Sequence, residues 1–92
     1  MYFVYIFRCA DGSFYVGYAQ DLSERVRAHN SGRGAAYTFN RLPVKLVYSE
    51  THPTRATALR RERQLKGWSR EKKDALIRGD LVLLRKLSKR RT

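Results

Sequence analysis

The chain has 92 residues, the size of one small domain, and its 42% hydrophobic residues suffice for a thin packed core. Twenty lysines and arginines against eight acidic residues give a net charge of +12, the electrostatic footprint of a nucleic-acid binder. A single cysteine and two histidines exclude an internal disulfide and a standard zinc site, and we expect no membrane span, no secretory leader and a cytoplasmic location.

Three segments have the composition of β-strands. Residues 2–9 and 13–18 are rich in aromatic and β-branched side chains, and a turn signal separates them. Residues 44–51 follow a segment, 31–43, that contains two glycines and a proline and is predicted to be a basic loop. We therefore expect a small three-stranded antiparallel sheet.

The turn between the first two strands decides which side chains share a face. A two-residue loop would place Tyr5 and Tyr15 on opposite faces, because one step of register turns every side chain over. A three-residue loop, with Gly12 in the left-handed conformation, places Tyr5 opposite Gly17 and Phe7 opposite Tyr15. We predict the three-residue loop, in which the two tyrosines share a face.

Four helices are expected, each after a capping residue. They cover residues 22–30 after Asp21, 55–66 after Thr54, 70–78 after Ser69, and a short last helix after Asp80. The resulting order is ββαβαα plus a terminal helix, which is an α+β domain with helices flanking the sheet. We assign one domain to residues 1–87 and a basic, frayed tail to residues 88–92.

Four polar side chains are candidates for chemistry on the first half of the chain. Tyr5 and Tyr15 can pack a core or present their hydroxyls to a substrate. Arg25 and His29 lie four residues apart on one helix, so they share a face. Arginine can clamp a phosphate and histidine can move a proton near neutrality, although a surface arginine and a boundary histidine are the plainer interpretation.

Glu62 is the fifth candidate. It lies among arginines and lysines, three residues from both Leu59 and Leu65, which should face the core. A carboxylate at that rim can hold one Mg²⁺ through an oxygen ligand, with waters and phosphate oxygens completing the octahedron. The plainer alternative is an ion pair with a neighbouring arginine.

Together these residues resemble a known family. The tripeptides Val4-Tyr5-Ile6 and Tyr15-Val16-Gly17 resemble the two motifs of the GIY-YIG nucleases, with valine in place of the first glycine. Arg25 and His29 follow at the expected spacing, and the segment 58–68 resembles the stretch that carries the family's metal-binding glutamate, at Glu62. The resemblance covers about residues 1–80 and is nearest to the small single-domain YhbQ-like proteins and the N-terminal nuclease domain of UvrC.

The resemblance implies a divalent-metal-dependent endonuclease that hydrolyses DNA phosphodiester bonds, with structure-selective cleavage in repair or recombination as one role it suggests. It implies catalytic roles for Tyr5, Tyr15, Arg25, His29 and Glu62, with one Mg²⁺ or Mn²⁺ on Glu62. Two departures from relatives concern the fine mechanism: Tyr18 stands where some carry lysine or threonine, and no asparagine follows Glu62.

Substrate binding is expected to come from a basic face, with RNA as an alternative to DNA. Cations on phosphates give strong, salt-dependent binding with little sequence information. The candidates are Arg33, Arg41, Lys45, Arg60, Arg63, Lys66, Arg70, Lys72 and Lys73. We expect Trp68 to pack a corner between two helices rather than to stack on a base.

We expect a monomer, with a protein partner as one source of specificity. Two other functions stay open from sequence: a nucleic-acid-binding module with this fold and little or no cleavage, and a basic protein that docks on a repair or ribosomal assembly.

Overall fold

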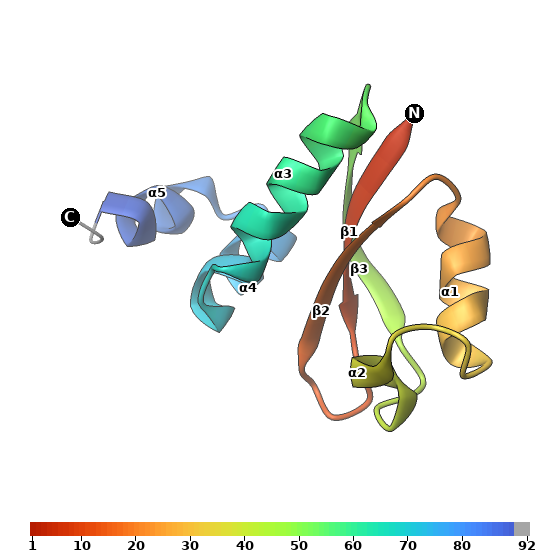
Figure 1. Ribbon diagram of the computed structural model, residues 1–92. Helices are drawn as coiled ribbons and strands as arrows, with labels where there is room; N and C mark the ends of the chain where they lie inside the picture. The colour runs from red at the N-terminus through yellow and green to blue at the C-terminus, as the bar shows by residue number, and fades with distance from the viewer. Residues whose placement is uncertain (90–92) are drawn as a thin grey trace.

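The computed structural model describes residues 1–89 and confirms the predicted α+β architecture (Figure 1). Three antiparallel strands form one sheet in the order β2-β1-β3, and helices lie on both of its faces. The elements are β1 Tyr2–Arg8, β2 Phe14–Ala19, α1 Leu22–Asn30, α2 Ala36–Phe39, β3 Lys45–His52, α3 Arg55–Lys66, α4 Arg70–Arg78 and α5 Leu81–Lys89.

The hairpin has the predicted register. Tyr5 pairs with Gly17 and Phe7 pairs with Tyr15, and Gly12 adopts a left-handed φ of 85° in the turn. Because side chains alternate along a strand, Tyr5, Phe7 and Tyr15 point to one face of the sheet. The three-residue loop is therefore confirmed, and with it the common face of the two tyrosines.

Each face of the sheet carries its own apolar cluster. Val4, Ile6 and Val16 pack against Ala58 and Leu65 of α3. The opposite face packs against α1 and the segment just before β3, through Tyr5, Phe7, Cys9, Ala19 and Val44 with Tyr15, Leu22, Val26 and Leu42 around them. The sheet is thus covered by α3 and α4 on one side and by α1 on the other (Figure 1).

The predicted caps set the helix boundaries. Asp21, Thr54 and Ser69 each accept a hydrogen bond from a backbone N–H in the first turn of the following helix. Gly79 ends α4 in the left-handed conformation. Among residues 1–89, no helix is long and apolar enough to cross a membrane.

Two segments differ from the sequence-based expectation. The predicted loop 31–43 contains the short helix α2, because one turn closes where the Thr38 amide donates to the Ala35 carbonyl. The predicted frayed tail, 88–92, begins inside α5, which continues through Lys89; residues 90–92 lie outside the described part of the chain. The end of α1 is tied to the residue just before β3, since the Asn30 side chain exchanges two hydrogen bonds with the backbone of Val44.

Candidate active site

Tyr5 lies across Gly17 on the edge strand β2. Its side chain is fully buried, and a Cβ added at position 17 would stand 2.6 Å from the Tyr5 Cζ and still closer to the hydroxyl oxygen. Any larger residue at position 17 would therefore collide with the ring. Gly17, in the second tripeptide, thus leaves the space that the Tyr5 ring of the first tripeptide occupies.

The Tyr5 hydroxyl is buried and has no hydrogen-bond partner among the described residues. Burial raises the pKa of this phenol to about 12, and the nearby Arg25 guanidinium opposes the rise. Tyr15 and the Glu62 carboxylate also lie near enough to raise it further. One hydroxyl thus interacts with three of the other predicted site residues, which come from β2, α1 and α3.

Arg25 is held at the junction of α1 and the sheet edge. Its Nη1 donates to the Tyr18 carbonyl of β2 at 3.3 Å. Two hollows open beside it, so the guanidinium has an anion-accessible side while one of its N–H groups is anchored. Such a fixed fork of donors suits phosphoryl oxygens.

His29 is only 2% exposed and has a defined hydrogen-bond arrangement. The Thr38 hydroxyl donates to the Ala35 carbonyl at 3.0 Å, so it accepts from His29 Nδ1 at 2.8 Å. This assigns the proton to Nδ1 and leaves the Nε2 lone pair available. Burial, together with the charge of Arg25, lowers the pKa of His29, which keeps the imidazole neutral at physiological pH.

A glycine and two aromatic rings fix the plane of the imidazole. A Cβ at Gly34 would lie 2.5 Å from His29 Nδ1, so the loop backbone passes directly over the ring. Phe7 contacts the imidazole edge-on at a centroid distance of 5.0 Å, and the Tyr15 ring lies at 5.3 Å. His29 is therefore a rigid neutral base beside Tyr15.

A hollow of about 480 Å³ opens in front of these groups. It is lined by Tyr15, Glu24, Arg25, Ala28, His29, Arg33, Gly34 and Ala35. Two guanidinium groups face one carboxylate there, so positive charge is in excess and the cavity suits a phosphate.

Glu62 reaches the site from α3. Its side chain is 13% exposed, and Lys66 Nζ lies 3.5 Å from its Oε2. In residues 1–89 no group of three or more histidine, cysteine, aspartate or glutamate side chains could enclose an ion. One hard carboxylate at the rim fits Mg²⁺ or Mn²⁺, which bind through one or two carboxylates and keep water and phosphate oxygens as their other ligands.

The predicted nucleic-acid-binding cations differ in what surrounds them. Arg33 lines the phosphate-sized hollow, and Lys66 borders Glu62. Arg70 lies over Phe14 of β2, with its guanidinium carbon 4.3 Å from the ring centroid. Arg41 instead pairs with Asp11 at 3.0 Å. The exposed Arg60 and Arg63 lie on α3, and the exposed Lys45 begins β3.

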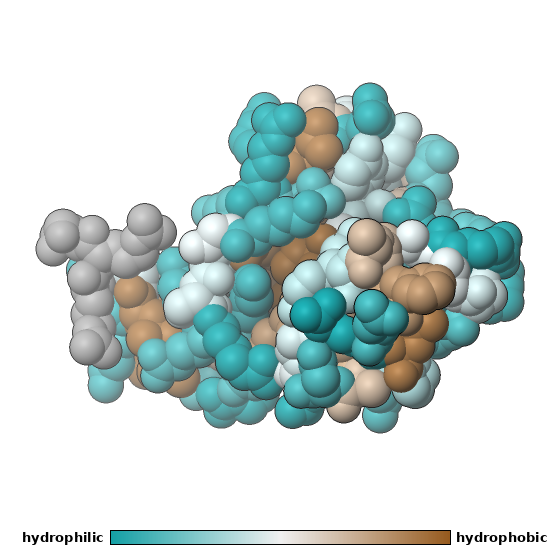
Figure 2. Space-filling model, turned by 60° about the horizontal axis from the view of Figure 1, so that its bottom comes forward, coloured by the Kyte–Doolittle hydropathy of each residue, from teal (hydrophilic) through white to brown (hydrophobic). Residues whose placement is uncertain are grey.

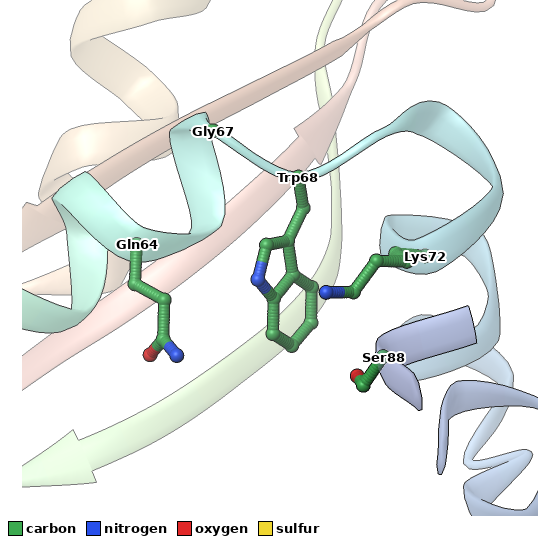
Figure 3. A pocket seen from close by; sticks show the side chains of 5 residues that line it. All are labelled: Gln64, Gly67, Trp68, Lys72 and Ser88. Atoms are coloured by element: carbon green, nitrogen blue, oxygen red, sulfur yellow. The ribbon is translucent and has the colours of Figure 1, made fainter. Parts of the chain in front are cut away.

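A larger hollow, of about 590 Å³, holds none of the catalytic candidates. Gln64, Gly67, Trp68, Lys72 and Ser88 line it, and the indole ring faces the Lys72 amine (Figure 3). Trp68 packs against the core cluster beneath α3, as predicted for a corner residue. Lys72 Nζ lies 4.3 Å and Arg61 Cζ 5.2 Å from the centroid of its ring. These contacts around the indole belong to the packing of the helical layer.

Sequence reasoning missed Thr38, Gly34 and Tyr37. Thr38 is fully buried and orients His29, but it lies nine residues away in a segment without periodicity. The one available signal was the abundance of small residues from 31 to 36, where Arg33 is the exception, and small residues permit close backbone approach to a ring. Tyr37 stacks on Tyr15 at a centroid distance of 6.0 Å.

Comparison with known proteins gives a consistent result. Residues 1–74 match the GIY-YIG catalytic domain. A UPF0213 protein of Staphylococcus aureus is 52% identical over 77 residues, which cover 84% of this chain and 94% of the relative.

Two solved structures are also similar. The UPF0213 protein BH0048 of Bacillus halodurans has 44% identity and a TM-score of 0.54, over 84% of this chain and 83% of that one. The protein EF2693 of E. faecalis has 35% identity and a TM-score of 0.59, over 88% and 86%.

Proposed function

Because the chain belongs to the GIY-YIG catalytic-domain family, a nuclease superfamily, we propose that it is a divalent-metal-dependent endonuclease that hydrolyses DNA phosphodiester bonds. The observation that carries the proposal is the hollow that Tyr15, Arg25 and His29 line together, beside the buried Tyr5 hydroxyl, whose pKa the charges of Arg25 and Glu62 shift. These groups come from four elements, and a binding module would have no need of a carboxylate among its phosphate-binding cations.

The phosphate enters the hollow beside Arg25. The guanidinium is anchored on Tyr18 and offers its other N–H groups to the phosphoryl oxygens, where negative charge builds in the transition state. Arg33 adds a second positive charge to the same cavity. A removed donor of this type typically costs about 2.7–4 kcal/mol of transition-state stabilisation.

His29 is the group best placed to accept a proton. Its Nε2 carries a lone pair because Thr38 holds the proton on Nδ1. The Tyr15 phenol lies beside the imidazole, orients the attacking water and relays its proton to Nε2. Tyr5, with a pKa of about 12, stays protonated; its hydroxyl is buried and does not line the hollow, so we assign it the role of positioning Arg25.

Glu62 would hold the metal. A bound Mg²⁺ or Mn²⁺ supplies charge neutralisation on the phosphate and on the leaving oxygen. Lys66, 3.5 Å from the carboxylate, balances the charge of Glu62 in the absence of the ion and can swing toward a phosphate in its presence. The basic surface around the site binds the sugar–phosphate backbone, and hydrophilic side chains dominate the face shown in Figure 2.

The test is cleavage of supercoiled plasmid and of a panel of branched DNAs, with Mg²⁺ or Mn²⁺ against EDTA. Glu62→Gln should abolish metal-dependent nicking and leave DNA affinity in EDTA within about twofold. Glu71→Gln, which removes the same charge from an exposed site on α4, is the matched control and should cleave like the wild type.

A panel of branched substrates also tests a role in repair or recombination, since structure-selective cleavage would favour junctions or flaps over linear duplex. Equal cleavage by wild type and Glu62→Gln would refute the assigned metal ligand. Tight binding without cleavage under every metal condition would favour the binding-module alternative.

A further inference from the structure

A second hollow adjoins the candidate site on the other side of Tyr15. It measures about 410 Å³ and is lined by Phe14, Tyr15, Val16, Tyr37, Lys66 and Lys73. Four elements enclose it: the edge strand β2, the short helix α2 and the adjacent ends of α3 and α4. Tyr15 belongs to both hollows, so a ligand could extend from one into the other.

Tyr37 is the exposed end of a row of aromatic rings. Tyr5 lies 4.4 Å from Phe7, Phe7 lies 6.5 Å from Tyr15, and Tyr15 lies 6.0 Å from Tyr37, as centroid distances. The last two pairs are close to parallel, with interplanar angles of 28° and 26°. Tyr5 is buried, whereas Tyr37 is 41% exposed, so the row runs from the catalytic core to the surface.

The Tyr37 ring is held in place. The Arg41 guanidinium carbon stands 4.1 Å from its centroid, and Arg41 Nη1 donates to the Tyr37 carbonyl at 2.6 Å. Arg41 is itself fixed by its ion pair with Asp11 on the hairpin turn. Arg41 and Tyr15 thus lie against the two faces of the ring, and the part that stays exposed loses little conformational entropy when a ligand in the hollow contacts it.

Cations complete the hollow. Lys66 also borders Glu62, so this hollow reaches the proposed metal ligand. Lys73 is half-buried, and its burial together with the charge of Arg70 lowers its pKa. Aromatic faces next to lysines are the combination that binds a base and its flanking phosphates in single-stranded nucleic acids.

We propose that this hollow takes one nucleobase of the substrate, with Tyr15 and Tyr37 as its aromatic walls and Lys66 and Lys73 on the flanking phosphates. The inference rests on the proposed function for the position of the cleaved bond, which lies next to Glu62 and Arg25. A base within a duplex cannot enter, because it is stacked and paired. The substrate class is therefore nucleic acid with at least one unpaired nucleotide beside the cleaved bond.

The experiment measures binding in EDTA, where no cleavage occurs. Fluorescence anisotropy compares a thymidine oligonucleotide with a fully abasic oligonucleotide of equal length and charge. The wild type should prefer the thymidine strand by about 5- to 100-fold, the range that base stacking on aromatic side chains supports. Tyr37→Leu should lose most of that preference, whereas Tyr37→Phe should keep it.

Phe39→Leu is the matched control. Phe39 is a more exposed aromatic residue on the same helix, at 59%, and it does not line the hollow. Its replacement should leave the preference unchanged, and circular dichroism should show that each variant is folded. Equal binding of the two strands by wild type, or an unchanged preference in Tyr37→Leu, would overturn the inference.

The outcome also separates this inference from the proposed activity. If plasmid cleavage is absent under all metal conditions while the base preference is intact and depends on Tyr37, the proposed nuclease activity is refuted and the base-binding hollow is supported. If cleavage depends on Glu62 but there is no base preference, the nuclease activity is supported and the base-binding hollow is refuted.

Discussion

Gly17→Ala is a direct test of the packing that builds the site. The new methyl carbon would stand 2.6 Å from the Tyr5 Cζ, whereas ordinary contacts begin near 3.4 Å, so the ring must move by roughly 0.8 Å. Tyr5 is fully buried and packs on Phe7 at 4.4 Å, which leaves it no free direction.

The expected cost follows from two opposing effects. Overpacking of a buried ring costs about 1–3 kcal/mol of the free energy of unfolding. The loss of glycine flexibility in the unfolded chain returns about 0.4–1 kcal/mol. We therefore expect a net destabilisation of about 1–2 kcal/mol, or a fall in Tm of about 5–15 °C for a domain of this size.

Urea unfolding followed by circular dichroism measures this change, with cleavage assayed on the same samples. Gly67→Ala is the matched control, because a Cβ there meets only ordinary contacts at 3.6 and 3.9 Å and φ is −83°. In a Tyr5→Ala background the cost of Gly17→Ala should largely vanish. A Gly17→Ala protein as stable and as active as the wild type would refute the placement of Tyr5 over Gly17.

Two further predictions concern His29. Thr38→Val removes the acceptor of the His29 Nδ1 proton, so it should destabilise the fold by about 1–3 kcal/mol, mix the imidazole tautomers in ¹⁵N NMR spectra and slow cleavage. Thr38→Ser keeps the acceptor and should restore all three properties. An unchanged Nδ1–H signal in Thr38→Val would contradict the assignment. Because the pKa of His29 is lowered in the fold, the unfolded state binds more protons below the ordinary value of 6.5, so the free energy of unfolding should fall as the pH drops from 6.5 toward the lowered value. Denaturant midpoints measured from pH 8 to 5 should show this slope in the wild type and a weaker slope in His29→Gln, and equal slopes would count against a buried neutral imidazole.

Much of the site followed from local rules in the sequence. The turn at Gly12 fixed the hairpin register, and the register placed Tyr5 and Tyr15 on one face. Helix spacing placed Arg25 and His29 together, and a capping residue located the helix that carries Glu62. Each of these inferences depended on neighbours within a few residues.

The remainder depended on contacts across the chain. The position of Thr38 against His29, and of Gly34 over the same ring, is set by how the segment 31–43 folds back on α1. A helix of four residues has too few positions to show an apolar period, so α2 and its Tyr37 gave no sequence signal. Basic residues were also hard to sort, since Arg41 and Arg33 look alike in sequence while one pairs with Asp11 and the other lines the cavity.

The position of Trp68 gives this protein a built-in optical probe. It is the only tryptophan in the chain, and it lies between the cationic groups of Arg61 and Lys72 at the corner where α3 meets α4. Arg61 in turn contacts Glu50 on β3, so the indole is coupled to the packing of α3 on the sheet. Emission from this single indole will thus follow the integrity of the helical layer during unfolding.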